Sequence, residues 1–325
     1  MTQKMFSTKP RLAIVIPCYN ESEVLAVTIT TLLNLLKQLH AICSQDSYVV
    51  FVDDGSHDDT WEQIQQASRA HSQVLGIRLV QNVGTQAAIL AGLEYVTDRC
   101  DLALTTDADL QDDLNTVQQM VEQAKEGKEI VLGVRECRKI DSFFKRVTAN
   151  LFYDVMVMLG IPLTKNHSDF RLMTSSVLKR LRQFHESNLF LRGFINRLSR
   201  NVGVVTYVRQ QRIAGETKWS TKRLILFAWT GITSFSVVPL RFILCMGIVV
   251  FLGSISLALF SLVCKLMGQT IPGWASITVP LYTLGGLLMI SLGIVGEYVG
   301  KIYEEVKRRP RYFIDSTTTS EESRD

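Results

Sequence analysis

Two long stretches without a charged residue constrain the fold more than any other feature of the sequence. Phe242–Cys264 contains 23 residues and Ala275–Gly296 contains 22, and neither holds Asp, Glu, Lys or Arg. About 20 apolar residues in a helix cross the hydrocarbon core of a bilayer, whereas helices of soluble proteins are usually much shorter. The connector Lys265–Trp274 is short. The two stretches therefore predict an antiparallel hairpin of two transmembrane helices.

Basic residues flank this predicted hairpin on both sides. They are Arg209, Arg212, Lys218, Lys222 and Arg223 before it, and Lys301, Lys307, Arg308, Arg309 and Arg311 after it. The connector carries only Lys265. The positive-inside rule then puts both ends of the hairpin in the cytoplasm. Leu224–Phe235, just before the hairpin, fits either an interfacial helix or an N-terminal extension of the first span.

The composition excludes several other classes of protein. With 47% apolar and 20% charged residues, the chain is neither disordered nor collagen-like as a whole. The formal net charge of +4 gives no reason to expect nucleic-acid binding. The six cysteines form no C-x-x-C pair or zinc-like cluster, so we expect reduced thiols. Reduced thiols fit a cytosolic catalytic part. The N-terminal segment lacks the apolar core of a signal peptide.

The first half of the chain predicts an α/β sheet. Short, β-branched apolar segments predict strands at Leu12–Ile16, Tyr48–Val52, Leu75–Val80, Leu102–Thr106 and Glu129–Val134. Helical patterns lie between them, such as Ser22–Leu39, for which Asn20 and Glu23 would form a capping box. We expect Asp58 or Asp59 to cap the next helix, and Asp113 to cap a later one. Alternating strands and helices indicate a mostly parallel sheet covered on both faces.

Acidic residues follow two of these predicted strands directly. Asp53 and Asp54 end the second, and Asp107 and Asp109 follow the fourth, with Gln111 close behind. Ligands of such sheets bind beyond the carboxyl ends of the strands, and grouped oxygen ligands favour Mg²⁺ or Mn²⁺ together with substrate phosphates. A single acidic turn is often no more than a helix cap. The pattern matches neither an EF-hand nor a P-loop nor a G-x-G-x-x-G dinucleotide motif.

The order of the motifs resembles a known family. PCYNE (17–21), VDDGS (52–56), Asn82-x-Gly84 and DADLQDD (107–113) resemble family 2 glycosyltransferases with the GT-A fold. The later segments Ser168–Met173, Arg212–Trp219 and Gly296–Pro310 are similar to polyisoprenyl-phosphate glycosyltransferases, the relatives of dolichol-phosphate mannose synthase, and most of all to bacterial bactoprenol glucosyltransferases. The resemblance covers about residues 10–312. It implies a Rossmann-like, mostly parallel GT-A domain followed by a two-helix transmembrane hairpin.

The resemblance also implies binding sites. The positions that hold the donor nucleotide in this family correspond here to Pro17, Tyr19, Glu21, Asp53, Asp54 and Asp107. Asp107, Asp109 and Gln111 match the metal site, where Mg²⁺ or Mn²⁺ bridges the donor diphosphate and assists the leaving group.

Four further residues match catalytic positions. Arg135 matches the position for the acceptor phosphate, and Arg212 and Lys218 match a mobile basic loop that closes over the donor diphosphate. Asp169 matches the position usually assigned as the catalytic carboxylate. A lipid phosphate is already largely anionic at neutral pH, so Asp169 would act either as a base or by orienting a hydroxyl or the acceptor. In the second case Asp169→Asn retains measurable turnover.

The resulting hypothesis is transfer of a hexose, glucose from UDP-glucose, to undecaprenyl phosphate with inversion. The protein would be multi-pass in a bacterial inner membrane, with the catalytic domain and both termini in the cytoplasm. Predicted parts are a GT-A domain (1–210), a basic loop with an interfacial helix (211–236), the hairpin (237–300), and a basic segment with a disordered tail (301–325). Mannose, GlcNAc or an amino-arabinose as the sugar remains an alternative, as does a non-catalytic membrane scaffold. A processive polysaccharide synthase fits less well because Q-x-x-R-W is absent.

The oligomeric state stays open at this point. Gly285, Gly286, Gly293 and Gly296 in the second apolar stretch would allow close helix packing, as in a homo-oligomer. Ordinary glycine usage in transmembrane helices explains them equally well.

Overall fold

The structure is a computed structural model of the 325-residue chain. It describes residues 6, 8–136, 167–184, 191, 197–208 and 274–318, with scattered residues between 240 and 267. The chain divides into two compact units: Met1–Val157, Pro162–Trp219 and Arg309–Asp325 form the first, and Met158–Ile161 with Ser220–Arg308 form the second. The predicted boundaries at 210 and 236 lie outside the described residues and stay predictions.

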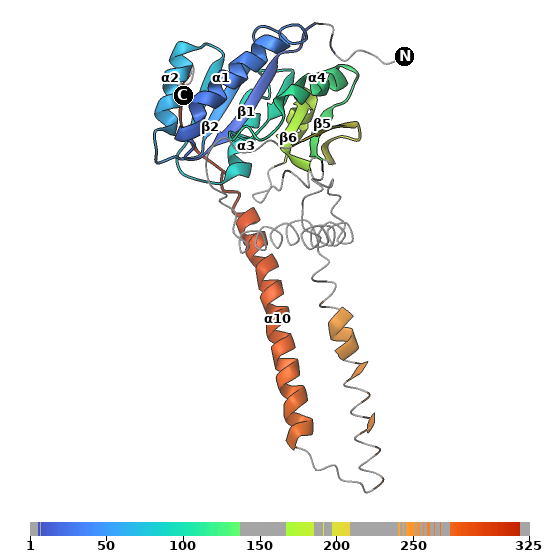
Figure 1. Ribbon diagram of the computed structural model, residues 1–325. Coiled ribbons are helices and arrows are strands. Elements are labelled where there is room, and N and C mark those ends of the chain that lie inside the picture. The colour runs from blue at the N-terminus through green and yellow to red at the C-terminus, as the bar shows by residue number, and fades with distance from the viewer. Residues whose placement is uncertain are drawn as a thin grey trace. The chain divides into compact units, whose positions relative to one another are not determined.

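The first unit is built on one eight-stranded mixed sheet (Figure 1). Its strands are β1 (Leu12–Cys18), β2 (Tyr48–Asp53), β3 (Val74–Leu79), β4 (Leu102–Thr105), β5 (Ile130–Arg135), β6 (His167–Thr174), β7 (Val202–Tyr207) and β8 (Ile314–Thr317). The strand order is β7-β5-β6-β4-β1-β2-β3-β8. Pairing is parallel between β1 and β2, β1 and β4, β2 and β3, and β5 and β7. Strand β6 runs antiparallel between β4 and β5, and β8 runs antiparallel to β3. The five predicted strands are confirmed as β1 to β5.

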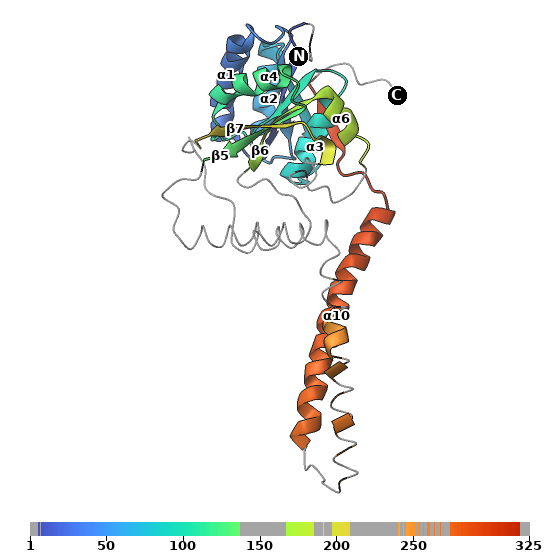
Figure 2. The ribbon, with the colours of Figure 1, turned by 90° about the vertical axis from the view of Figure 1, so that its right-hand side faces the viewer.

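Helices cover both faces of this sheet because side chains alternate along each strand. They are α1 (Ser22–Leu39), α2 (Thr60–Ala70), α3 (Thr85–Val96), α4 (Val117–Lys125) and α6 (Ser175–Leu181), with a 3₁₀ turn, η1 (Leu114–Thr116), before α4. Leu12, Ile14 and Ile16 of β1 share one buried cluster with side chains of α1, α2 and α4. Val15 faces α3 instead, where a Cβ added at Gly92 would lie 2.4 Å from its side chain. Figure 2 shows α1 and α4 on one side of the sheet and α3 and α6 on the other.

The predicted helix caps are partly confirmed. Asp113 accepts a hydrogen bond from Asn115 N and caps η1, as expected. The capping box at the start of α1 is wrong: Glu21 is the N-cap residue, without a side-chain hydrogen bond. Asn20 has a positive φ of 52°, and its Oδ1 accepts from His57 N. In this left-handed conformation Asn20 does not cap α1. Its side chain instead links the loop after β1 to the loop after β2.

The second unit contains the long helix α10 (Trp274–Val306), which covers the whole second apolar stretch. Within it, Thr283–Val306 is long and apolar enough to cross a membrane, with a mean hydropathy of 1.5, and none of its most apolar window is buried. The helix continues six residues beyond the predicted end of the hairpin at Gly300. Ten of the 23 residues of the first apolar stretch, Phe242–Cys264, lie outside the described residues, so the two-span topology stays a prediction.

The polar tail departs from the sequence-based expectation of disorder. Ile314–Thr317 forms β8 at the edge of the sheet, and Thr318 and Gly76 exchange hydrogen bonds through Gly76 N to Thr318 Oγ1 (2.9 Å) and Thr318 N to Gly76 O (3.0 Å). Just before β8, Tyr312 donates its hydroxyl hydrogen bond to Glu94 of α3. Backbone pairing with an exposed strand edge orders a polar segment that local composition alone predicts to be disordered.

Candidate functional site

The chemistry-bearing residues gather at one edge of the sheet. The carboxyl ends of the parallel strands β1, β2, β4 and β5 meet there, and the antiparallel strand β6 begins there. Thr105 at the end of β4 pairs with Val15 on one side and with Arg171 on the other. This register brings the acidic segment after β4 close to Asp169 on β6, although 62 residues separate Asp107 from Asp169 in the chain.

The loops after β1 and β2 form a connected pair. Asn20 N donates to Ser56 Oγ (3.0 Å), and Glu21 N donates to the hydroxyl of Thr60 (3.0 Å). The half-buried ring of Tyr19 meets His57 edge-on, with 6.4 Å between ring centroids. Pro17 is the last residue but one of β1 and pairs with Val52. The predicted nucleotide residues of these two loops therefore lie side by side.

Asp53 and Asp54 are both buried but have different partners. Asp53 Oδ1 accepts from Ser56 N (3.1 Å), and its Oδ2 lies 3.5 Å from Nε of Arg78 on β3. Burial raises the pKa of Asp53, while the Ser56 hydrogen bonds oppose the shift.

Asp54 connects β2 to the start of α3. Its two carboxylate oxygens accept from Val83 N (2.8 Å) and Gly84 N (2.9 Å). Gly84 has φ +93°, a conformation that favours glycine. The predicted Asn82-x-Gly84 motif is thus a turn held by Asp54. The hydrogen bonds of Asp54 fix this loop to the end of β2, and its predicted contact with the nucleotide stays a prediction.

The segment after β4 places several carboxylates close together. Asp109 Oδ1 accepts from Gln111 N (3.2 Å), and the loop is tied to α1 because Thr28 donates to Ala108 O (2.8 Å). The pKa of Asp107 is raised to about 7, mainly by burial and then by the nearby charges of Asp112, Asp169 and Asp109, while Arg135 opposes the shift. Crowded negative charge of this kind favours a bound cation.

Asp112 lies among the site residues but was not singled out from the sequence. It is buried, and its carboxylate accepts hydrogen bonds from Tyr207 of β7 and Thr106, with the nearest Arg135 nitrogen 3.6 Å away. Arg135 Nε also donates to the Tyr207 hydroxyl (3.1 Å). The available signal was the pair of adjacent acidic residues in QDD (111–113), of which Asp112 is the first. Tyr207 gave none, because the sequence analysis expected no strand at 202–207.

Asp169 is held from two sides. Arg171, which is fully buried, donates from its terminal nitrogen to Asp169 Oδ1 at 2.8 Å. Gln86 of α3 donates from Nε2 to Asp169 Oδ2 at 3.2 Å. The backbone oxygen of Asp169 accepts from the hydroxyl of Thr105. Neither Arg171 nor Gln86 was singled out from the sequence.

The donor atoms present suit a divalent cation that is shared with a substrate. Among the residues that the structure describes, no three His, Cys, Asp or Glu side chains are grouped as a complete metal site. Mg²⁺ is commonly held by only one or two carboxylates, with substrate phosphates and water completing its octahedron. Asp107 and Asp109, with the amide oxygen of Gln111, match that requirement. The pKa of Asp107 is raised first by burial and then by neighbouring carboxylates, whose negative charge a cation would neutralise.

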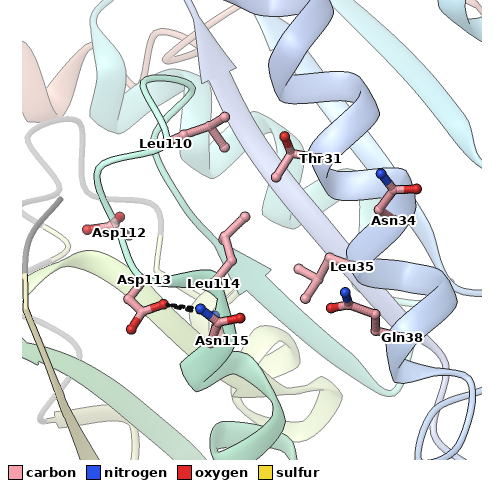
Figure 3. A pocket seen from close by; sticks show the side chains of 9 residues that line it. All are labelled: Thr31, Asn34, Leu35, Gln38, Leu110, Asp112, Asp113, Leu114 and Asn115. Carbon is pink, nitrogen blue, oxygen red and sulfur yellow. Dashed lines mark hydrogen bonds between the residues drawn. The ribbon is translucent and has the colours of Figure 1, made fainter. Parts of the chain in front are cut away.

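A hollow of about 330 Å³ lies beside this acidic segment. In Figure 3, Thr31, Asn34, Leu35 and Gln38 of α1 form one wall, and the loop from Leu110 to Asn115 forms the other. The dashed line marks the hydrogen bond between Asn115 and Asp113. Asp112 borders both this hollow and the Arg135–Tyr207 contact.

Two predicted catalytic residues cannot be located. Arg212 and Lys218 fall in 209–239, outside the described residues. The structure brings together Asp107, Asp109 and Asp169 with Arg135, but it leaves the prediction for the basic loop untested.

The mixed, mostly parallel sheet covered by helices on both faces, with carboxylates beyond β4, defines a GT-A-like α/β fold. The model of the family described as "Glycosyl transferase family 2" matches residues 13–182. The chain belongs to this family and is a glycosyltransferase.

Similar proteins are matched over almost their full length. An uncharacterised glycosyltransferase, YkoT, of Bacillus subtilis is 45% identical over 96% of this chain and 93% of its own length. The bactoprenol glucosyl transferase of Shigella phage SfX is 33% identical over 94% of this chain and 99% of its own. Among solved structures, glucosyl-3-phosphoglycerate synthase from Mycobacterium tuberculosis, in complex with Mn²⁺, UDP-glucose and phosphoglyceric acid, is 17% identical, with a TM-score of 0.45, over 69% of this chain and 78% of that one.

Proposed function

We propose that this glycosyltransferase moves a hexose, glucose from UDP-glucose, to a polyprenyl phosphate, undecaprenyl phosphate, with inversion at the anomeric carbon. The observation that carries the proposal is the grouping of Asp107, Asp109 and Asp169 at one edge of the sheet, next to Arg135. The relatives named bactoprenol glucosyl transferases support the acceptor and the sugar.

Each part of the edge has a chemical task in this reaction. A divalent cation on Asp107, Asp109 and Gln111 would neutralise charge on the leaving diphosphate. The loops after β1 and β2 bind the nucleotide through Pro17, Tyr19, Glu21 and Asp53, which lie together at the ends of their strands.

The binding site for the acceptor phosphate is inferred from the positive charge of Arg135. Arg135 lies 3.6 Å from Asp112, and its charge opposes the raised pKa of Asp107, so we assign to it the phosphate of the lipid. That phosphate is largely ionised at neutral pH and can attack without a strong base. Asp169, whose carboxylate is fixed by Arg171 and Gln86, then orients a sugar hydroxyl or the acceptor.

Membrane attachment raises the local concentration of the acceptor. The apolar, exposed helix α10 supplies one candidate span, and the apolar stretch 242–264 is proposed as the other. With both spans in place, the catalytic unit stays in the cytoplasm beside the lipid headgroups. This tethering raises the effective concentration of the lipid acceptor at the active site.

The decisive experiment is a donor screen on membranes that contain the full chain, with undecaprenyl phosphate and Mg²⁺. UDP-glucose, UDP-GlcNAc, GDP-mannose and a nucleotide-linked amino-arabinose are offered in turn, and the lipid product is identified by mass spectrometry. We expect a polyprenyl-phosphate hexose from UDP-glucose. Product from another donor alone would refute the assignment of the sugar.

Two variants sharpen this screen. Asp107→Asn should abolish transfer, whereas Asp113→Asn, in the same loop, keeps an N-cap side chain and should retain it. A chain that never releases UDP when the lipid is added would be a non-catalytic scaffold, which contradicts the proposal.

A further inference from the structure

Gln86 stands on a rigidly positioned part of the fold. It is the second residue of α3, directly after the Val83–Gly84 turn that both oxygens of Asp54 fix to the end of β2. Gly92, further along α3, packs so closely on β1 and β2 that an added Cβ would lie 2.4 Å from Val15. The start of α3 is therefore anchored independently of Gln86.

The side chain of Gln86 has one satisfied end and one unsatisfied end. Its Nε2 donates to Asp169 Oδ2 at 3.2 Å, and because an ionised carboxylate only accepts hydrogen bonds, the amide NH₂ group must face it. The other end, Oε1, is buried and has no hydrogen-bond partner among the residues that the structure describes.

This arrangement does not favour stability. A buried carbonyl oxygen without a partner costs free energy of about the same size as the hydrogen bond to a charged group contributes. The two effects of the Gln86 amide on folding thus oppose each other. Residues that break a local rule without a gain in stability are expected at functional sites.

The position of Gln86 complements that of Arg171. Arg171 is charged and donates to Oδ1 at 2.8 Å from two residues along the same strand, whereas Gln86 is neutral and donates to Oδ2 from helix α3. A neutral donor fixes the direction of the second oxygen without adding another positive charge to it.

We propose that Gln86 is a positioning residue that orients the Asp169 carboxylate for sugar transfer. This inference rests on the proposed function, because it assumes that Asp169 acts on the transferred sugar or the acceptor. It predicts that Gln86 contributes to turnover and contributes little to stability.

The test compares Gln86→Met with a matched control in the full chain, using UDP-glucose and undecaprenyl phosphate. Methionine keeps the length of the side chain and removes both polar ends. Gln118→Met is the control, because Gln118 on α4 also donates its amide to a carboxylate, that of Glu122 (3.0 Å), but on an exposed helix face. We expect Gln86→Met to lower kcat at least about tenfold with the KM for UDP-glucose within about twofold, and its Tm to stay within about 3 °C. Gln118→Met should change none of these values.

A double variant tests whether Gln86 acts through Asp169. In an Asp169→Asn background, Gln86→Met should cause no further loss beyond about twofold, because coupled residues are not additive. A kcat within about twofold of wild type for Gln86→Met, or a full tenfold loss on top of Asp169→Asn, would overturn the proposal. If Asp169→Asn falls to background, the kcat and Tm of the single variant decide. A wild-type chain without transfer would instead overturn the proposed function.

Discussion

Replacing Arg171 by methionine should destabilise the catalytic unit strongly, because it leaves a buried carboxylate without its cation. Arg171 is completely buried, the side chain of Asp169 is only 7% exposed, and 2.8 Å separates the paired atoms. Removing one partner of such a pair costs about 3–5 kcal/mol, far more than losing an exposed ion pair. For a unit of this size that corresponds to a fall in Tm of roughly 6–20 °C.

The assay is thermal unfolding of the full chain in detergent, followed by tryptophan fluorescence. Trp61, buried on α2, lies in the same unit as the ion pair and reports its unfolding. Arg171→Met combined with Asp169→Asn removes the uncompensated charge, so the double variant should recover about half of the loss or more. A Tm for Arg171→Met within about 2 °C of wild type, or a double variant less stable than Arg171→Met, would refute the reasoning.

Three further outcomes are expected. Mg²⁺ should raise the Tm more at pH 8 than at pH 5.5. Because the pKa of Asp107 is about 7, well above its usual value, Asp107 keeps its proton at pH 5.5, and the metal-free folded state loses stability as the pH rises towards 7. An equal shift in Tm at both pH values, measured by thermal unfolding, would contradict this. Deleting 311–325, which removes β8, should lower the Tm by several degrees, whereas deleting only 319–325 should not, and equal effects would show that β8 contributes nothing. Gly92→Ala should cost about 1–3 kcal/mol by overpacking against β1, measured by the same unfolding assay, while Gly286→Ala, with nothing within 4 Å of the new Cβ, is the neutral control.

The central strands were predictable because their signal is local. β1 to β5 are short runs of mostly buried, apolar residues, and the leucines of α1 repeat at the spacing that one apolar face of a helix requires. The limits of Ser22–Leu39 were predicted to the residue although its cap was not, because apolar periodicity reflects packing against the sheet. The left-handed Asn20, by contrast, follows from hydrogen bonds to another loop that no local pattern reveals.

β6, β7 and β8 were not predicted, for a different physical reason. β6 carries the buried pair Asp169 and Arg171 on one face and the core residues Phe170 and Leu172 on the other, and β8 is a polar segment ordered by pairing with β3. β6 pairs with β4 and β5, β7 pairs with β5, and β8 pairs with β3, so in each case strands distant in the sequence supply the stabilisation. Sequence reasoning therefore found the residues of the motifs but missed Gln86, Asp112 and Tyr207, whose roles arise only from contacts.

The direction of β6 explains why one edge of the sheet holds all of these groups. In a purely parallel sheet, a residue at the start of a strand lies at the amino edge, away from the ligand. Because β6 runs antiparallel between β4 and β5, its first residues reach the carboxyl edge instead, so that Asp169 raises the pKa of Asp107 across the sheet. The parallel strands already supply Asp53, Asp107 and Arg135 at this edge. The reversed strand adds the Asp169 carboxylate there, together with the buried Arg171 that holds it. Reversal of β6 is thus the topological step that lets one edge bring a cation-binding segment and an oriented carboxylate together.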